Sequence, residues 1–290
     1  MTAYNREKYI ADAIQSILNS TYKNFELIIV DDCSTDNTSN IIKAFELNDN
    51  RVKVYSNDKN LGDYKNRNKA ASYAKGKYIK YLDSDDIIYP FSLEYMVGCM
   101  EQYPTAAFGF CYRQTQINSQ PFPKQYSPVQ AYKEHFLENG FFYAGPGSCI
   151  IRRDYFDDIG QFSGKRYVGD FELWLSLSKK NNCIVFQSGL IWWRTHEGQE
   201  FELGQKKGNY LLANFKCIKE ALFNAQCPLD PKDIQKAFHI QKVLFCRNVL
   251  SLFITNNNIA YKIYKQSNLN IFDCFISVFP LRFSKYYYEK

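Results

Sequence analysis

The chain has 290 residues, enough for one large domain or for a catalytic domain with an appendage, and its apolar fraction of 46% predicts a substantial core. The net charge of +6 is uneven, because residues 205–290 hold 13 Lys and Arg against 5 Asp and Glu, whereas the remainder has a net charge of −2. The first six residues lack the apolar h-region of a signal peptide, and the longest apolar stretches, at 141–151 and 271–283, are short or interrupted. We therefore expect neither secretion nor a membrane-spanning segment.

The cysteines and the basic residues narrow the range of cellular compartments and binding partners to consider. Nine cysteines are scattered without Cys-x-x-Cys spacing or clustering with histidine, which favours reduced thiols in the cytoplasm over a disulfide framework or a zinc site. The basic excess of residues 205–290 is either a solvated helical face or a contact for an anionic partner, such as a membrane surface or a lipid-linked diphosphate. No nucleic-acid-binding motif accompanies the charge, so we expect no nucleic acid partner.

The first hundred residues alternate between helical and extended patterns. Helical spacing of apolar residues, with Asn5 as a plausible N-cap region, and short apolar runs predict helices at 10–18, 38–45 and 63–74, and strands at 25–30, 52–55 and 78–82. Such alternation predicts a mostly parallel α/β sheet flanked by helices, in which ligands bind beyond the carboxyl ends of the strands. Two acidic clusters, at 31–32 and 83–86, follow strands directly.

The remaining residues predict a different organisation. Residues 103–204 mix short strands and aromatic loops with one clear helix at 170–179, and residues 205–290 are mainly helical around the turn at 228–231. We expect a catalytic domain at 1–204, made of a nucleotide-sugar half (1–102) and an acceptor half (103–204), followed by a basic helical extension at 205–290.

The run Asp83-Ser84-Asp85-Asp86 is the first candidate site. Carboxylates after a strand are either caps and turn formers or ligands of a hard cation such as Mg²⁺ or Mn²⁺, which favours oxygen atoms and shares them with substrate phosphates. Three neighbouring carboxylates repel one another, and a divalent cation relieves that repulsion. The residues alone leave both interpretations open, because Asp-x-Asp is a weak motif by itself.

Many ordered segments of the first two hundred residues resemble family 2 glycosyltransferases. They are Ala3-Tyr4-Asn5-Arg6, 16–22, Phe25 to Asp36, Asn60-Leu61-Gly62, Arg67-Asn68, 76–79, Leu82 to Asp86, Gly147-Ser148, Arg152-Arg153, 160–162, Gly169 to Leu175 and Trp193 to Gly198. The resemblance implies the GT-A fold, a nucleotide-sugar donor, a divalent metal (Mn²⁺ or Mg²⁺) and inverting transfer. Beyond residue 204 no specific resemblance is found.

For the donor, the resemblance implies a base-binding pocket and a phosphate contact. Asp32 would hydrogen-bond the nucleotide base, with Ala3, Tyr4 and Arg6 lining that pocket. Arg67 would approach the ribose or the diphosphate of the donor.

For the acidic run, the resemblance separates three roles. Asp83 would contact the ribose and sugar, and Asp85 would ligate the metal that bridges the diphosphate, with His196 near the metal or diphosphate on a closing loop. Asp86 would be a supporting or capping residue.

Asp170 is the expected general base. Inverting transfer is a single displacement at the anomeric carbon, in which a carboxylate removes the proton of the acceptor hydroxyl. Asp170 opens the helix expected at 170–179, and the dipole at that end favours a charged carboxylate. Taken without the resemblance, an N-cap is the commoner explanation for an aspartate at this position.

The sequence departs from the family pattern at its beginning. Family members open with an apolar strand before the turn that corresponds to Thr2 to Asn5, and here Met1 stands where that strand should end. We therefore expect the first central strand to be missing, which would leave the strands ending at Val30 and Leu82 without ladder partners. Cys33 is a milder departure, at a position where the family usually has glycine.

The combined expectation is an inverting glycosyltransferase that uses a nucleotide-sugar, with UDP-sugar as the commonest donor for this resemblance, and a glycan or lipid-linked acceptor. It would be cytoplasmic, with possible peripheral membrane contact through 205–290. Two alternatives stay open: a non-catalytic sugar-nucleotide-binding protein, and a sugar nucleotidyltransferase, although the glycine-rich phosphate loop of the latter is not visible.

Overall fold

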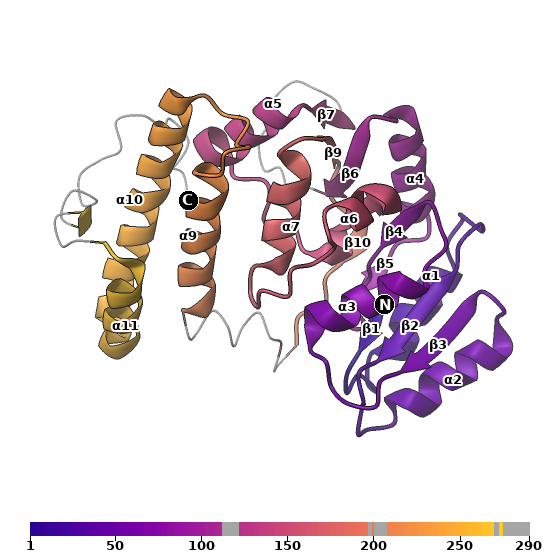
Figure 1. The fold of residues 1–290 in the computed structure, drawn as a ribbon. Helices are drawn as coiled ribbons and strands as arrows, with labels where there is room; N and C mark the ends of the chain where they lie inside the picture. The colour runs from indigo at the N-terminus through magenta and orange to yellow at the C-terminus, as the bar shows by residue number, and fades with distance from the viewer. Residues whose placement is uncertain (112–121, 197–198, 200–207, 270–272, 275–290) are drawn as a thin grey trace.

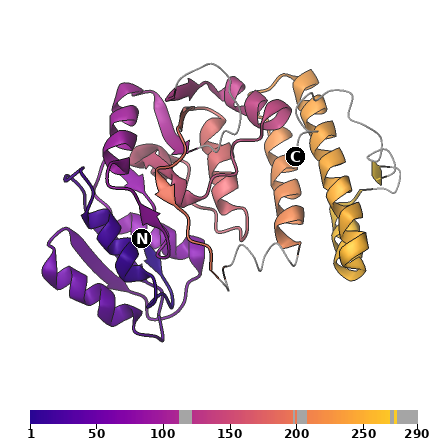
Figure 2. The ribbon, with the colours of Figure 1, turned by 180° about the vertical axis from the view of Figure 1, so that it is seen from behind.

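The computed structural model describes residues 1–111, 122–196, 199, 208–269 and 273–274. Figure 1 shows the N-terminal strands and helices, in indigo and purple, at one end of the molecule and the C-terminal helices, in orange and yellow, at the other. A second sheet and its helices lie between them, and the reverse view in Figure 2 gives the same order. The structure confirms the expected α/β sheet flanked by helices, with a helical C-terminal part.

The N-terminal sheet is parallel and has the order β1-β2-β3. Its strands are β1 (Thr2–Ala3), β2 (Leu27–Asp31) and β3 (Val52–Ser56), and its helices are α1 (Ile10–Leu18), α2 (Thr38–Asn48) and α3 (Asp63–Tyr73). These bounds agree closely with the predicted elements. The prediction of an N-cap region at Asn5 was wrong: α1 begins at Ile10, and the Asn5 side chain instead accepts a hydrogen bond from the backbone N–H of Thr35.

The first strand exists only as the two residues of β1, which pair with β2. Met1 extends this ladder, because its amine donates to the carbonyl of Ile28 and its carbonyl accepts from Val30. Within the described residues no ladder joins β1 or β2 to β4 (Tyr78–Lys80). A cavity of about 640 Å³ separates them, lined by Met1 and by residues of β2, β4, α3 and α4 (Ser92–Gln102). The expectation that these strands would lack ladder partners was wrong, because β2 pairs with β1 and β3, and β4 pairs with β8.

The second sheet is mixed, with the order β4-β8-β6-β9-β7 and only the β6–β9 pair parallel. Its further strands are β6 (Ala106–Cys111), β7 (Lys124–Tyr126), β8 (Cys149–Arg152) and β9 (Asn182–Phe186). The helices beside it are α5 (Pro128–Lys133), the π-helix η1 (Glu134–Glu138), the 3-10 helix η2 (Pro146–Ser148), α6 (Arg153–Asp158) and α7 (Gly169–Ser178). Aromatic packing joins sheet and helix, since the ring of Phe108 stacks on Trp174 with centroids 5.2 Å apart.

A short antiparallel pair connects the two regions near the acidic run. β5 (Ile87–Ile88) follows Asp86 directly and pairs with β10 (Ile191–Trp192). β10 leads into Arg194 and His196. The pairing with β5 therefore brings these two residues to the loop that contains Asp83 to Asp86, although the two segments are more than a hundred positions apart.

In the C-terminal part the described residues include the helices α9 (Asn209–Leu222), α10 (Pro231–Thr255) and α11 (Asn257–Ser267). The turn expected at 228–231 is present, and Asp230 caps α10 by accepting from the backbone N–H of Asp233 at 2.8 Å. Ile218 and Leu222 of α9 and Ile240 of α10 share one core with α7. The domain boundaries proposed from the sequence stay a prediction.

Among the described helices, α10 alone is long and apolar enough, by length and composition, to cross a bilayer. The apolar runs singled out in the sequence did not include it. Residues such as Ala237, Val243 and Val249 of α10 are buried against its neighbours, and a core helix of a soluble protein passes the same length and composition test.

Candidate active site

The acidic run forms the loop between β4 and β5, and each of its carboxylates has a different partner. Asp83 Oδ1 lies 2.7 Å from Nη2 of Arg67, which also pairs with Asp63. Asp85 Oδ2 lies 3.0 Å from Nε2 of His196 and 3.5 Å from Nε of Arg6. Five of the residues predicted to share the donor and metal site thus contact one another, Arg67 with Asp83, and His196 and Arg6 with Asp85.

Asp86 is held by the backbone rather than by a side-chain cation. Its Oδ1 accepts from the N–H of Arg194 at 3.0 Å, and the Arg194 guanidinium donates to the carbonyl of Asp85. Burial, reinforced by the charge of Asp83, raises the pKa of Asp86 to about 7. This agrees with a supporting place for Asp86, and the structure adds Arg194 as the residue that fixes the loop.

Asp83 differs from Asp86 because it has a guanidinium beside it. Burial acts to raise the pKa of Asp83, but the charge and hydrogen bond of Arg67 outweigh burial and hold that pKa below its usual value. Arg67 is itself buried, whereas the Asp83 side chain is partly exposed, so water screens their attraction in part. The surroundings of Asp83 therefore favour its ionised form.

The loop fits a divalent cation by the chemistry of its donors. Asp85 supplies a carboxylate oxygen and His196 an imidazole nitrogen, already in contact with one another. A side chain built at Gly147 would lie 3.6 Å from Asp83 Oδ2 and 3.7 Å from Asp86 Oδ2, so both carboxylates face one spot that glycine leaves open. Among the described residues no group of three or more His, Cys, Asp or Glu is arranged to hold a metal alone. Mg²⁺ sites commonly take one or two protein ligands and complete their shell with substrate phosphates and water.

The residues predicted to bind the nucleotide base lie around the carboxyl ends of β1 and β2. Ala3 is buried and accepts from the backbone N–H of Asp32 at 2.8 Å, whereas the Tyr4 side chain is exposed. Arg6 donates from Nη1 to the carbonyls of Tyr4 and Asn5. These residues are neighbours, as the prediction requires.

Asp32 has structural partners that the sequence did not indicate. Its Oδ1 accepts from Asn57 and from the backbone N–H of Leu61, and its Oδ2 accepts from the N–H of Gly62. A carboxylate oxygen has two lone pairs, so Oδ2 keeps room for one more donor. Asp32 thus organises the loop before α3, and base recognition by this residue stays a prediction.

Asp170 lies in the first turn of α7 and is largely buried. Its Oδ1 accepts from the backbone N–H of Phe171 at 2.8 Å and lies 3.3 Å from the hydroxyl of Tyr64. Burial raises the pKa of Asp170 to about 6, only partly opposed by the Phe171 hydrogen bond and the charge of Arg67. A carboxylate with a pKa near 6 is ionised at neutral pH and still basic enough to accept a proton.

Two further residues of the site were not identified from the sequence. Lys80 is half-buried at the end of β4, and its ammonium donates to the carbonyls of Tyr81 and Gly147. Burial lowers the pKa of Lys80 to about 8. Lys80 could have been found in the sequence because it is a lysine inside an otherwise apolar strand. Arg194 could have been found because it belongs to a segment that resembles the family, although it was given no role.

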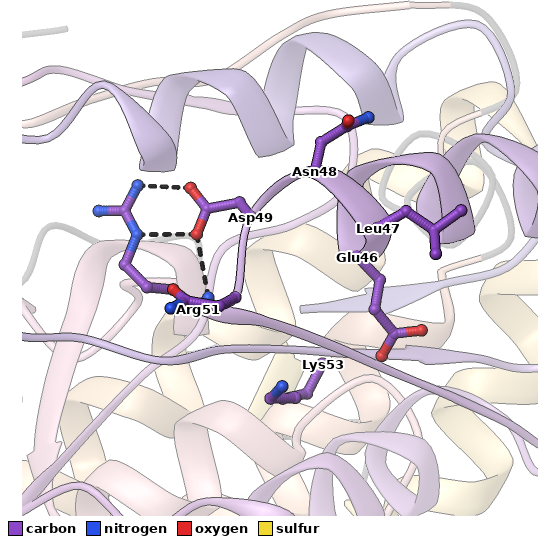
Figure 3. A pocket seen from close by; sticks show the side chains of 7 residues that line it. Glu46, Leu47, Asn48, Asp49, Arg51 and Lys53 are labelled. Carbon is purple, nitrogen blue, oxygen red and sulfur yellow. Dashed lines mark hydrogen bonds and ion pairs between the residues drawn. The ribbon is translucent and has the colours of Figure 1, made fainter.

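A separate hollow lies at the end of α2 and contains none of the predicted residues (Figure 3). It is open and polar, and the pair Asp49–Arg51, with a nitrogen–oxygen distance of 2.7 Å, stands at its edge. Its lining consists of surface residues of the α2–β3 turn, namely Glu46, Leu47, Asn48, Asp49, Asn50, Arg51 and Lys53. We assign it no function.

The fold and the acidic loop define the class of protein. The structure is similar to Staphylococcus aureus TarS residues 1–349 in complex with UDP-GlcNAc, with a TM-score of 0.61 at 19% identity over 88% of this chain and 72% of that chain. It is also similar to the mannosyltransferase PcManGT from Pyrobaculum calidifontis in complex with GDP-Man and Mn²⁺, with a TM-score of 0.63 at 13% identity over 96% of this chain and 84% of that chain. At these identities the likeness concerns the fold, which is that of GT-A glycosyltransferases.

The sequence comparisons name the family. Residues 1–160 match glycosyl transferase family 2, and the chain belongs to that family. It is 33% identical over 196 residues to the UDP-Glc:alpha-D-GlcNAc-diphosphoundecaprenol beta-1,3-glucosyltransferase WfgD of Escherichia coli, covering 66% of this chain and 73% of that protein. It is 34% identical over 192 residues to the putative teichuronic acid biosynthesis glycosyltransferase TuaG of Bacillus subtilis (strain 168), covering 63% and 75%. The protein is a glycosyltransferase.

Proposed function

We propose that this enzyme is an inverting glycosyltransferase that moves a sugar from a nucleotide-sugar, most simply a UDP-sugar, to a hydroxyl of a glycan or lipid-linked acceptor. The observation that supports the proposal most directly is the position of α3 between the acidic loop and Asp170. This helix contacts the acidic loop through Arg67 and the candidate base through Tyr64. A donor site and a proton acceptor therefore adjoin the same element.

On the donor side, this chain would contribute mainly charged side chains that are held in fixed positions. Arg67, buried and paired with Asp83, would present its guanidinium to the ribose or diphosphate. Arg6 and Tyr4 would line the base pocket beside Asp32. Two relatives support a UDP-sugar donor, because the name of WfgD begins with UDP-Glc and TarS binds UDP-GlcNAc.

On the acceptor side, Asp170 would take the proton of the attacking hydroxyl. Its Oδ1 is held by the N–H of Phe171, and Oδ2 would receive the proton as the new glycosidic bond forms. The helix dipole at the start of α7 favours the ionised carboxylate before the proton moves. The raised pKa of about 6 supports this role, because it brings the basicity of the carboxylate closer to neutral pH.

Asp85 and His196 are the residues that would hold a divalent ion, Mn²⁺ or Mg²⁺. When bound, such an ion would neutralise the charge that develops on the departing nucleoside diphosphate. The Mn²⁺ in the mannosyltransferase neighbour supports this assignment. In this chain, Arg194 would keep the carboxylate loop in place for the ion through its bonds to Asp85 and Asp86.

The acceptor and the location follow from the relatives and the charge distribution. WfgD acts on a sugar linked to diphosphoundecaprenol, and the basic excess of residues 205–290 suits a partner that carries a diphosphate. We therefore propose a cytoplasmic enzyme that meets a lipid-linked acceptor at the inner face of the membrane. Residues 1–204 would form its catalytic domain and 205–290 its basic helical extension.

A donor screen tests the reaction class. Purified enzyme is incubated with UDP-, GDP- and dTDP-sugars, with Mn²⁺, with Mg²⁺ or with a chelator, and the nucleotide product is identified. Release of nucleoside diphosphate that depends on the added metal supports the proposal. A parallel incubation with a nucleoside triphosphate and a sugar 1-phosphate tests the alternative enzyme, because a nucleotidyltransferase would release pyrophosphate from that mixture. Tight nucleotide binding without any turnover would indicate a non-catalytic protein.

A further inference from the structure

Tyr64 is the second residue of α3 and touches the candidate base, although the two lie 106 positions apart. Its hydroxyl oxygen is 3.3 Å from Asp170 Oδ1 and 3.4 Å from the backbone nitrogen of Asp170. The backbone N–H donates to the hydroxyl, and the hydroxyl donates to the carboxylate. One phenol thus bridges the main chain and the side chain of the same residue.

The two oxygens of Asp170 are consequently not equivalent. Oδ1 accepts from the hydroxyl of Tyr64 and from the N–H of Phe171. Of the described residues, none hydrogen-bonds Oδ2. An anchored oxygen beside one without a bond is the arrangement that a carboxylate needs in order to accept a proton in a fixed direction.

Packing holds the ring of Tyr64 in this place. A Cβ at Gly169 would lie 2.7 Å from the Tyr64 ring, so the phenol lies directly against the backbone at the start of α7. On another side the ring contacts Phe162, with centroids 5.2 Å apart. The missing side chain at Gly169 is therefore what allows the phenol to reach Asp170.

The phenol remains a neutral donor at every working pH. Burial, followed by the charges of Asp170 and Asp63, raises the pKa of Tyr64 well above its usual range. The other ionisable groups that act with Asp170 are Arg67 and Asp63 on α3 and the thiols of Cys149 and Cys217. Burial raises the pKa of both thiols, so they are uncharged near neutrality.

We propose that Tyr64 is a positioning residue for transfer: its hydroxyl fixes Oδ1 of Asp170 so that Oδ2 is presented to the acceptor hydroxyl. The inference rests on the proposed role of Asp170 as base. It also makes α3 the element that aligns both sides of the reaction, because Arg67, one turn after Tyr64, pairs with Asp83 of the donor loop.

The test is Tyr64→Phe, which keeps the ring and its packing against Gly169 and removes only the hydroxyl. We expect kcat to fall about tenfold, the size of one hydrogen bond, while the KM for the donor and the melting temperature stay close to wild type. The acidic midpoint of the kcat–pH profile should move to higher pH, because the carboxylate loses a neutral donor. Tyr73→Phe, at the far end of α3 where the ring stacks on Tyr55, is the matched control and should behave as wild type.

A double-mutant cycle separates this inference from the proposed function. If Tyr64 acts through Asp170, adding Tyr64→Phe to Asp170→Asn causes no further loss of kcat. If Asp170→Asn is inactive while Tyr64→Phe has wild-type kcat and an unshifted pH midpoint, the positioning role is wrong and the base assignment survives. If Asp170→Asn keeps wild-type kcat, the base assignment itself fails. Should Tyr64→Phe lower the melting temperature but leave the pH midpoint unchanged, its role is structural and the proposal is overturned.

Discussion

Asp83 of the acidic loop and Asp170 both contact α3, yet their carboxylates lie in different electrical surroundings. Asp83 and Asp85 face the guanidinium groups of Arg67 and Arg6, and the pKa of Asp83 is held below its usual value. Asp170 is buried with hydrogen bonds from neutral donors, and its pKa is raised to about 6. The pKa of the same type of side chain is thus lowered in one place and raised in the other, because its neighbours differ.

The largest effect on donor binding should come from Asp85→Ala. Removing the carboxylate that pairs with His196 deletes half of the proposed ion site, so we expect metal-dependent donor binding to weaken by on the order of 100-fold. Calorimetry with a UDP-sugar and Mn²⁺ measures this directly. Asp158→Ala, an exposed aspartate of α6, is the control, and unchanged donor affinity in Asp85→Ala would remove Asp85 from the metal site.

Arg67→Gln should lower the stability of the fold, an effect that activity assays alone would not measure. It leaves Asp63 and Asp83 without their cation, and we expect a loss of about 2–3 kcal/mol in the free energy of unfolding, since Asp83 is partly exposed. Urea denaturation gives the value. Arg51→Gln removes a guanidinium from the surface pair with Asp49 (Figure 3) and should cost less than about 1 kcal/mol. Equal losses in both variants would contradict the distinction between the two pairs.

Filling the cavity between β2 and β4 should stabilise the fold. A five-residue valine-rich segment fused before Met1 can continue the ladder that Met1 already begins along β2, and it buries apolar surface in a space of about 640 Å³. We expect the melting temperature to rise by about 2–8 °C, which corresponds to a gain of about 1–2 kcal/mol in a domain of this size. A glycine–serine segment of equal length is the control, and an equal response to both segments would show that the cavity does not accept a strand.

The same fusion carries a second readout. Burial lowers the pKa of the Met1 amine to about 5, below its value of 8.0 in the unfolded chain, so between these two values the unfolded state binds more protons. Stability should therefore rise as pH increases from 5 to 8, and the amine's share of this rise disappears when Met1 has a preceding peptide bond. A pH dependence identical before and after fusion would contradict the burial of the amine.

The smallest expected effect is the pH dependence of the wild-type enzyme. The base must be ionised, so kcat should reach half of its plateau at a pH of about 6 and fall about tenfold for each pH unit well below that. Turnover measured between pH 4.5 and 8 at saturating donor checks this. A half-maximal pH near 4 would indicate that the working carboxylate is solvated rather than buried.

The sequence predicted the parts of this molecule that depend on local pattern. Apolar spacing located α1 and β2, and the acidic clusters at Asp32 and Asp83 come shortly after β2 and β4, as the pattern of the sequence indicated. The partners of these residues could not be predicted, because they depend on contacts across the fold. The N–H of Arg194 reaches Asp86 over 108 positions and Tyr64 reaches Asp170 over 106, and no spacing rule relates such residues.

The most direct test of the account is the comparison of donor binding with turnover in Asp170→Asn. The variant keeps the acidic loop and its cations, so we expect the Kd for a UDP-sugar with Mn²⁺ to stay within about twofold of wild type, while kcat falls by on the order of 10³. Asparagine can still accept hydrogen bonds from Phe171 and Tyr64, but it cannot remove the acceptor proton at neutral pH. Wild-type turnover in Asp170→Asn, or a parallel loss of donor binding and turnover, would contradict the assignment of donor binding to the acidic loop and of proton removal to Asp170.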